Sequence, residues 1–380
     1  MLRAIAFAVL LMMSVGTAHA VTVNVSTVEE LYAAVERCNQ GERGLAVVLA
    51  DGTYTLDHML WVEGDGLSVR SASGNRNAVL IQGHGMDGDV THVFNVAGYG
   101  FTLENVSVGR VSQHGVQFQP EADDPMLRNI RVFDCGEQLV KVAWDDSRPD
   151  VSCDYGVLEN SLLEYTADFG PQYYIGGIDC HRSEGWVVRG NVFRNIRSPA
   201  DSPAEHAVHF WSQARDTMVE YNLIINCDRG IGFGLGDRGH MGGVIANNVI
   251  VHDGRGQFAD VGIGLENAGY ALVAHNTILM RQSYPNAIEY RFSGTSAVIA
   301  NNLANRAIAA RDGGQAELVA NITNAQESWF VNPAGYDFHL APGAVQAIDS
   351  GAPLADVSRD MDGEARPMGA APDIGADEAQ

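Results

Sequence analysis

A motif of two short apolar strands recurs five times between Trp186 and Asp312, and each copy is 26 to 31 residues long. In every copy the first strand ends in Asn, a loop follows, and a second apolar strand comes next. These Asn residues are Asn191, Asn222, Asn248, Asn276 and Asn302. A repeat of this length with two β-rich runs and no helical period is typical of a β-solenoid, whose coils stack about 4.8 Å apart. The repeat therefore predicts an all-β fold in which each coil buries the apolar face of the next.

Two properties of Asn explain why it would recur at a corner of the coil. Asn tolerates the left-handed backbone that a sharp bend needs, and stacked amides can hydrogen-bond from coil to coil. The same strand-end pattern continues outside the five copies, at Asn105, Asn129, Asn160 and Asn321. We therefore predict a ladder of Asn side chains along the solenoid.

The first 20 residues have the features of a secretory signal sequence. Arg3 supplies the charged end, residues 4–15 form an apolar run, and Ala18-His19-Ala20 forms a cleavage site. The run is too short to span a bilayer, and no second apolar stretch of about 18 residues follows. We therefore expect cleavage after Ala20 and secretion of the mature chain to a bacterial periplasm or the medium.

A capping box at Ser26–Glu29 is followed by apolar residues at helical spacing, which predicts a short helix at about 26–38. We expect this helix to cover the open first coil and its unpaired edge. A solenoid lengthens by adding coils and needs no division into domains. We therefore predict a single domain with one β-helix over residues 21–335, followed by a segment over residues 336–380.

The composition limits the kinds of partner. The net charge is −23 and the pI is near 4.7, so nucleic acid and anionic membranes are poor partners. An acidic glycan would need local positive charge in order to bind. Five Cys allow at most two disulfides, whose pairing the sequence leaves open, and we expect Cys180 and Cys227 to be buried. We expect a monomer.

The second strands of the repeat can be stacked in register, because side chains alternate between the two faces of a strand. This stacking predicts a row of core residues at Ile178, Val208, Ile231, Ile263, Ile288 and Ile308. It also predicts three outward columns. The first is Gly177, Ala207, Gly230, Gly262, Ala287 and Ala307. The second is Lys141, Asp179, His209, Gly232, Gly264, Glu289 and Ala309, and the third is Ala143, His181, Trp211, Gly234, Glu266, Arg291 and Arg311.

Two adjacent coils carry Gly at every outward position except Glu266, whereas a solvent-facing strand without function carries larger polar residues. Strand Gly often marks the close approach of a ligand, so Gly232, Gly234 and Gly264 are candidate substrate-binding positions. His209 and Glu289 border these coils and would lie roughly 14 Å apart at about 4.8 Å per coil. We therefore predict an open groove along the solenoid axis that holds a few sugar rings.

A rigid, extended groove favours a polymer substrate, and the leading hypothesis is a polysaccharide lyase, or a related C5-epimerase, acting on a uronate-containing glycan. Such an enzyme removes the proton α to a carboxylate, which needs a base and a cation that neutralises the developing charge. His209 is the first candidate for the base, followed by Lys141 and His181. Arg291 and Arg311 are candidates to bind substrate carboxylates.

The remaining polar residues of the groove have supporting roles in this hypothesis. Glu289, as part of the catalytic set, and Glu266 would orient His or Arg partners or share a calcium ion. Trp211 and Asp179 complete the expected binding surface. No residue is assigned to a metal on the sequence alone, and the cofactor is unknown, with Ca²⁺ one option.

Two N-terminal stretches, "LADGTY" and "LIQGHG", resemble the entry of right-handed parallel β-helix proteins of the pectate-lyase-like superfamily. The tail over residues 336–380 looks like the C-terminal segment of many bacterial β-helix proteins, which implies a structural closing element. "CGEQLVKV", with Glu137 and Lys141, and "IDCHRSEGWVVRGN", with His181 and Arg182, faintly resemble the alginate lyase and chondroitinase-B-like branch. That branch implies a catalytic Lys with an Arg on the next coil. The second calcium-ligand Glu of its pattern is absent here, and the Glu-to-Lys spacing differs.

Two alternative functions remain open. A glycoside hydrolase needs a carboxylate pair, and Glu266 and Glu289 lie on neighbouring coils. A non-catalytic glycan-binding or adhesion solenoid fits the acidic charge, although Trp211 is the one aromatic residue expected in the groove. The sequence does not identify the sugar or its linkage.

Overall fold

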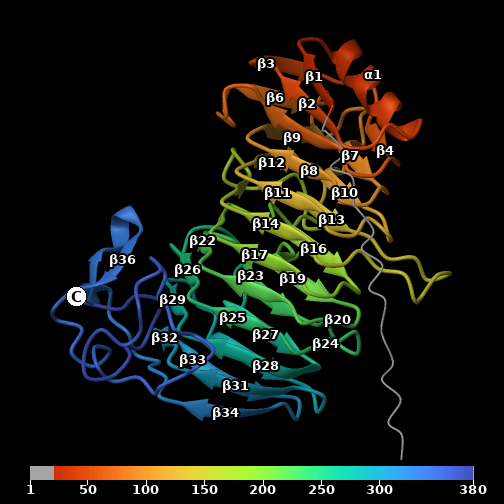
Figure 1. Cartoon of the computed structure of the whole chain (residues 1–380). Coiled ribbons are helices and arrows are strands. Elements are labelled where there is room, and N and C mark those ends of the chain that lie inside the picture. The colour runs from red at the N-terminus through yellow and green to blue at the C-terminus, as the bar shows by residue number, and fades with distance from the viewer. Residues whose placement is uncertain (1–20, 380) are drawn as a thin grey trace, which may run out of the picture.

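The computed structural model describes residues 21–379, which form a parallel β-helix of three long sheets with one α-helix (Figure 1). The signal sequence expected over residues 1–20 lies outside the described residues. Neighbouring strands within the three long sheets are parallel throughout. None of the described helices has both the length and the apolar character that crossing a membrane requires. The prediction of an all-β parallel β-helix is therefore confirmed.

Each complete coil contributes a strand to each of the three sheets. Sheet A contains β1 (Val21–Val25), β2 (Leu45–Leu49), β5 (Ser68–Ser71), β8 (Thr102–Glu104), β11 (Met126–Arg128), β14 (Val157–Glu159), β17 (Val187–Arg189), β20 (Ala214–Arg215), β21 (Met218–Glu220), β24 (His240–Met241), β25 (Val244–Ala246), β28 (Ala268–Ala274), β31 (Ser296–Ala300) and β34 (Gln315–Val319). Sheet B contains β3 (Gly52–Thr55), β6 (Val79–Gln82), β9 (Ser107–Val111), β12 (Arg131–Cys135), β15 (Leu162–Glu164), β18 (Val192–Arg194), β22 (Leu223–Ile225), β26 (Val249–His252), β29 (Thr277–Met280) and β32 (Leu303–Ala304). Sheet C contains β4 (Leu60–Val62), β7 (His92–Val96), β10 (His114–Phe118), β13 (Val140–Val142), β16 (Ile178–His181), β19 (His206–Trp211), β23 (Arg229–Phe233), β27 (Ile263–Glu266), β30 (Asn286–Arg291) and β33 (Ala307–Arg311).

The N-terminal helix α1 (Val28–Asn39) packs on the first coils. Its N-cap is Thr27, whose hydroxyl accepts a hydrogen bond from the backbone N–H of Glu30, while the Glu30 carboxylate accepts from the backbone N–H of Thr27. The capping box therefore starts one residue later than the Ser26–Glu29 pattern suggests. One face of the helix buries Leu31, Ala34, Val35 and Cys38 against the core.

The predicted register of sheet C is confirmed for the core row and for the second column. Ile178, Val208, Ile231, Ile263, Ile288 and Ile308 pair from strand to strand in that order. Lys141 pairs with Asp179, Asp179 with His209, and the series continues through Gly232 and Gly264 to Glu289 and Ala309. The period of two in the second strands is therefore a reliable guide to their pairing.

The first column does not face outward except at Ala307 on the last strand, so that prediction is wrong for the other five positions. A Cβ placed on Gly177 would lie 2.7 Å from Cδ1 of Phe193 in sheet B, and one on Gly262 would lie 2.8 Å from Cγ2 of Ile278. Ala207 is fully buried. Each strand enters sheet C through a corner, where the alternation slips, so that two successive residues point into the core. Small residues recur there because the interior has no room for larger ones, and the residue before them, such as His206, faces outward.

The predicted Asn ladder is present from Asn191 onward. The side-chain amide of each Asn donates to the side-chain oxygen of the next at 2.9–3.0 Å, through Asn191, Asn222, Asn248, Asn276, Asn302 and Asn321. In this row the left-handed backbone lies one residue earlier than expected, for example at Tyr221 (φ 58°) and His275 (φ 54°). Asn105, Asn129 and Asn160 lie outside the row, because they take the left-handed backbone themselves and Ser161 stands in the ladder position before Asn191. The ladder residue thus supplies hydrogen bonds, while its predecessor makes the bend.

The C-terminal residues pack against the side of the β-helix. They include the 3₁₀ turns η1 (Glu327–Trp329) and η2 (Pro333–Gly335) and the antiparallel pair β35 (Phe330–Asn332) and β36 (Asp337–Leu340). Phe330 and Phe338 form an apolar cluster with residues of β26, β29 and β32.

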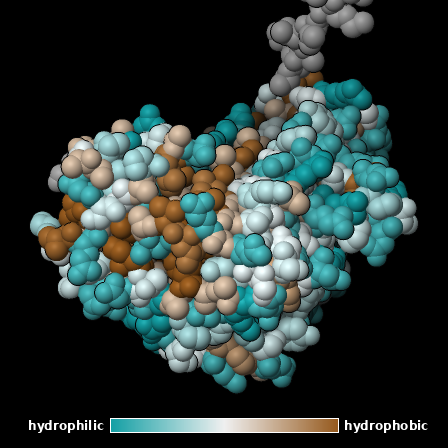
Figure 2. Space-filling view, turned by 90° about the horizontal axis from the view of Figure 1, so that it is seen from below, coloured by the Kyte–Doolittle hydropathy of each residue, from teal (hydrophilic) through white to brown (hydrophobic). Residues whose placement is uncertain are grey.

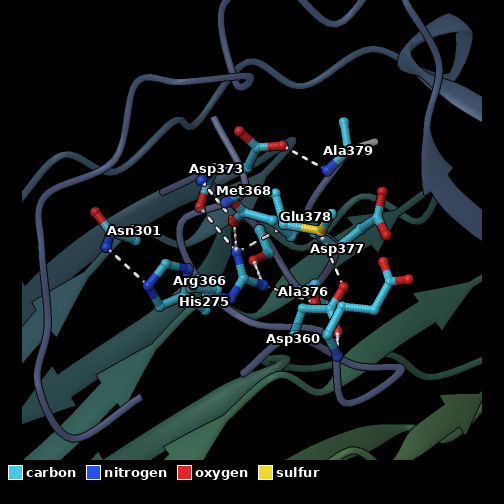
Figure 3. Close-up of polar contacts among 12 residues, drawn as sticks. His275, Asn301, Asp360, Arg366, Met368, Asp373, Ala376, Asp377, Glu378 and Ala379 are labelled. Carbon is cyan, nitrogen blue, oxygen red and sulfur yellow. Dashed lines mark hydrogen bonds and ion pairs between the residues drawn. The ribbon is translucent and has the colours of Figure 1, made fainter. Parts of the chain in front are cut away.

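The final turns of the chain are tied together by buried polar contacts (Figure 3). The guanidinium of Arg366 contacts the Glu378 carboxylate at 2.8 Å, and both side chains are 1% exposed. Asp360 accepts hydrogen bonds from the backbone N–H groups of Asp362, Glu364 and Glu378. Its carboxylate therefore stabilises the turn through these N–H groups.

The end of the solenoid at β34 remains exposed. Figure 2 views the molecule from this end and shows an apolar band on the surface. Leu318 of β34 is 49% exposed. All five Cys are buried and free, which agrees with the expectation that Cys180 and Cys227 serve as small apolar residues.

Candidate active site

Three predicted residues meet on the outward face of β13 and β16. The ammonium of Lys141 contacts the carboxylate of Asp179, and it lies 3.0 Å from Nε2 of His181. Nδ1 of His181 lies 3.0 Å from the hydroxyl of Ser212. Because an ammonium can only donate, Nε2 of a neutral His181 accepts from Lys141, while Nδ1 faces a hydroxyl that can donate or accept. The group is largely buried, since the Lys141 and His181 side chains are each 12% exposed.

The environment separates the pKa values of these groups. Burial lowers the pKa of His181 below its ordinary value, which favours the neutral ring at neutral pH. Burial alone would also lower the pKa of Lys141, but the charge and hydrogen bond of Asp179 outweigh it and raise that pKa. Burial of Asp179 is likewise outweighed by the charge of Lys141, which holds the pKa of Asp179 well below its ordinary value. The cluster therefore combines a neutral imidazole with an ammonium and a carboxylate.

His209 belongs to the same network but is covered. Its Nδ1 lies 3.5 Å from Asp179, which also accepts a hydrogen bond of 2.7 Å from the indole of Trp211. The rings of His209 and Trp211 stack with their centroids 5.1 Å apart, and the ring of His206 lies 4.4 Å away. His209 is 1% exposed. The expectation that His209 faces an open groove as the base is therefore wrong, because neighbouring rings of its own strand enclose it.

A pocket of about 460 Å³ opens beside Lys141 and His181. Trp144, directly after β13, forms one wall, and Arg238 lies 5.7 Å from the centre of its ring. The guanidinium of Arg182 lies 5.2 Å from the same ring. Arg238 also stacks over Trp211 at 4.1 Å and reaches within 3.3 Å of Nδ1 of His181. The pocket lining thus joins Trp144 to the cationic side chains of Lys141, Arg148 and Arg238 and also includes the carboxylates of Asp145 and Asp146.

The glycine coils do not form an open floor. A Cβ on Gly232 would lie 2.7 Å from Nε2 of His206, whose ring covers that position. A Cβ on Gly264 would lie 3.3 Å from Cγ1 of Val261. Gly234 has φ +79°, and a Cβ there would lie 1.8 Å from the carbonyl oxygen of Glu266. These glycines are buried, and they are required by close contacts within the chain, which corrects the predicted groove.

The predicted residues of the last coils form a separate network of ion pairs. Arg291 contacts Glu266 at 2.7 Å and Asp312 at 2.8 Å. Arg311 contacts Glu289 at 2.8 Å, and Glu289 is 3% exposed and also accepts a hydrogen bond from Tyr284. Five coil-to-coil steps lead from Lys141 to Arg291, which corresponds to roughly 24 Å at about 4.8 Å per step. The predicted site residues therefore lie on one sheet, as expected, but in two separate clusters.

Several site residues lie in loops, where the period of two does not predict which way a side chain points. Trp144, Ser212 and Arg238 follow strands of sheet C, and the structure shows that they lie at the pocket or contact His181. The polar, Gly-containing loop around Arg238 does carry a signal, since such loops on a rigid scaffold often form the rim of a site.

Comparison with known proteins supports the fold. No family model and no curated protein matches the chain. Among solved structures, pectate lyase Pel9A superposes with a TM-score of 0.67 at 16% sequence identity, covering 91% of this chain and 90% of that one. An alginate lyase from Paenibacillus sp. str. FPU-7 superposes with a TM-score of 0.53 at 16% identity, covering 78% of this chain and 97% of that one. At this identity the similarity shows a shared parallel β-helix fold.

Proposed function

We propose that this protein is a polysaccharide lyase that cleaves a uronate-containing glycan in the pocket beside Lys141 and His181. The observation that carries the proposal is the contact of a neutral imidazole with an ammonium at the edge of a pocket walled by Trp144. The resemblance in fold to a pectate lyase and an alginate lyase supports it. Fold alone does not give function, so the proposal depends on these side chains.

The chemistry divides between His181 and Lys141. Lys141, which stays charged, turns from Nε2 of His181 to the uronate carboxylate and stabilises the developing negative charge. Nε2 of His181 is then free to take the proton from the carbon next to that carboxylate, since its lowered pKa leaves the ring neutral. The electron pair of the broken C–H bond forms a carbon–carbon double bond as the glycosidic C–O bond breaks. The leaving oxygen takes a proton from water, and the proton released by His181 neutralises the resulting hydroxide. A C5-epimerase would share the first step but return a proton to the opposite face.

Local positive charge supports an acidic substrate on this acidic protein. Neither Arg182 nor Arg238 has an ion pair with an acidic residue within residues 21–379, whereas Arg291 and Arg311 are both paired. Both unpaired guanidiniums flank Trp144, on which a sugar ring can stack. Guanidinium groups bind carboxylates through two parallel hydrogen bonds. We therefore assign carboxylate binding to Arg182 and Arg238.

A binding protein without catalysis is the second candidate. Trp144 between two guanidiniums is the kind of platform that a glycan-binding module uses. A hydrolase receives less support, since Glu266 and Glu289 are both engaged by Arg residues. The signal-like residues 1–20 support secretion to the compartment where such glycans occur, and N-terminal sequencing of the exported protein would test cleavage after Ala20.

The test is a substrate screen with the purified chain. Alginate, polygalacturonate, glucuronan and glycosaminoglycans are incubated with it, with added CaCl₂ and with EDTA in parallel. The ultraviolet absorbance of an unsaturated product identifies a lyase, and new reducing ends without absorbance identify a hydrolase. Measurable affinity without any product would favour the binding protein and overturn the lyase proposal.

A further inference from the structure

A second group of chemically reactive side chains lies on sheet C, one coil beyond the proposed base. Glu205, His206 and His209 each offer an atom, and these three atoms lie within 4.8 Å of one another. We propose that Glu205, His206 and His209 bind one divalent transition-metal ion of the zinc type. Two imidazoles and a carboxylate are a donor set that suits zinc and its neighbours better than calcium, which takes six to eight oxygen ligands.

The ligand atoms have few competing contacts. Neither ring nitrogen of His206 has a hydrogen bond within the described residues, although the side chain is only 7% exposed. A buried polar group without a partner destabilises the folded chain, and a bound ion would supply the missing partner. The closest charged partner of Glu205 is Arg229, at the long distance of 3.9 Å. Arg229 is itself held by Asp260 at 2.9 Å, so its charge is largely offset.

His209 has a carboxylate behind one ring nitrogen. Its Nδ1 lies 3.5 Å from Asp179, while its Nε2 lies 3.3 Å from the carbonyl oxygen of Gly234, a long contact that an ion at Nε2 would replace. A carboxylate behind the ring fixes the tautomer and strengthens the ligand.

The surroundings of Gly176 add a second buried group without partners. Gln138 is fully buried, and neither its amide oxygen nor its nitrogen has a hydrogen-bond partner in the described chain. A Cβ on Gly176 would lie 3.1 Å from Cγ of Gln138 and 3.4 Å from Cβ of Glu205. Gln138 and Glu205 therefore both pack against Gly176, and the Glu205 side chain is 25% exposed.

The site needs only small side-chain movements. Zinc bonds of about 2.0–2.2 Å separate ligand atoms by roughly 3.5 Å, so the three groups must close by about 1 Å. Because Asp179 contacts both His209 and Lys141, the ion would fix the carboxylate that holds the Lys141 ammonium. The proposal does not depend on the lyase activity, since it concerns binding alone.

The experiment titrates ZnCl₂ into the metal-free, full-length mature protein by calorimetry and records the absorption spectrum of the Co²⁺ form. We expect one ion per chain and the intense visible bands of a low-symmetry, four-coordinate site. Removing a residue that only orients a ligand costs about 10–100-fold in metal affinity, so Glu205→Gln and His206→Gln should each weaken binding at least about 100-fold. Circular dichroism checks that both variants fold.

His339→Gln is the matched control, since His339, Asp362 and Asp377 form the other cluster of potential ligands in the described residues. It should bind Zn²⁺ as the native chain does. Stoichiometric binding that survives Glu205→Gln and His206→Gln, or that disappears in His339→Gln, would overturn the assignment. So would the absence of stoichiometric binding to the native chain.

Discussion

The ammonium nitrogen of Lys141 lies 3.0 Å from Nε2 of His181, which stands in the next column of the neighbouring strand. Asp179 contacts both side chains and keeps Lys141 charged beside a neutral imidazole. His181 and Lys141 could each be the base, but the neutral imidazole can accept a proton and the charged ammonium cannot. The pH dependence of kcat/KM distinguishes the two.

The pH dependence of kcat/KM should identify His181 as the base. Because burial lowers its pKa below the ordinary 6.5, the neutral ring should already dominate at pH 7. We expect kcat/KM to rise with pH below 6.5 and to be flat from pH 7 to 9. A rise that continues into the alkaline range would instead indicate Lys141, whose pKa is raised above 10.5.

His181→Gln should lower kcat by about 10²–10⁴-fold, the usual contribution of a positioned general base. Gln can keep a contact with Ser212, so the fold should be retained and far-UV circular dichroism should be unchanged. His84→Gln is the control, because His84 is an exposed residue of the N-terminal coils. Equal activity of His181→Gln and the control would remove His181 from the mechanism.

Arg238→Ala should chiefly raise KM for a charged glycan, because a guanidinium over Trp144 and Trp211 binds a substrate carboxylate. Loss of a charge-assisted hydrogen bond costs about 1.5–3 kcal/mol, equivalent to roughly 10–150-fold. Arg238→Lys should restore only part of the lost affinity, since the Lys ammonium cannot make the two parallel hydrogen bonds of a planar guanidinium. The measurement is steady-state kinetics at low and high salt, and an unaltered KM in Arg238→Ala would contradict the assignment.

The sequence predicts the register of the strands best where the coil is most regular. Side chains in sheet C alternate with a period of two over a packed core, so the pairing of Lys141, Asp179 and His209 could be predicted from the sequence. The prediction that the first column faces outward failed because alternation breaks down at the corner before each strand. Gly177, for example, is turned into the core there. The burial of His209 depends on the ring positions of His206 and Trp211, which alternation does not specify.

Asn248→Ala should destabilise the protein by about 2–5 kcal/mol. Its side chain accepts hydrogen bonds from the backbone N–H and the amide of Asn222, and it donates to Asn276 and to the carbonyl oxygen of Val219. The substitution leaves several of these buried groups unpaired, at about 1–3 kcal/mol for each group that water cannot reach. Urea denaturation measures the change. Asn324→Ala, at an exposed position, should change stability by less than about 0.5 kcal/mol, and equal effects would contradict a stabilising ladder.

Stability should also fall as pH rises from about 6.5 to about 9 because of His339. Hydrogen bonds from its ring to Asp337 and Asp362 raise its pKa from 6.5 to about 9. The folded protein therefore holds this proton more tightly than the unfolded chain, so the stabilisation is complete below pH 6.5 and is lost as pH passes 9. Thermal unfolding across this range should show a smaller decline in His339→Gln than in the native chain. His58→Gln, at an exposed position, should keep the native decline.

The buried ion pair of Arg366 and Glu378 should be essential to the C-terminal segment (Figure 3). Arg366→Met leaves the Glu378 charge buried without its partner, which costs about 3–5 kcal/mol. Adding Glu378→Gln removes that charge and should recover part of the loss, whereas a purely steric effect of Met would persist in the double variant. Arg281→Met is the control, because its pair with Glu327 is exposed and worth about 0–1 kcal/mol. Chemical denaturation measures the free energy of unfolding of the native chain, the two single Arg→Met variants and the double variant. Similar losses of stability in Arg366→Met and Arg281→Met would show that burial adds nothing to the Arg366–Glu378 pair.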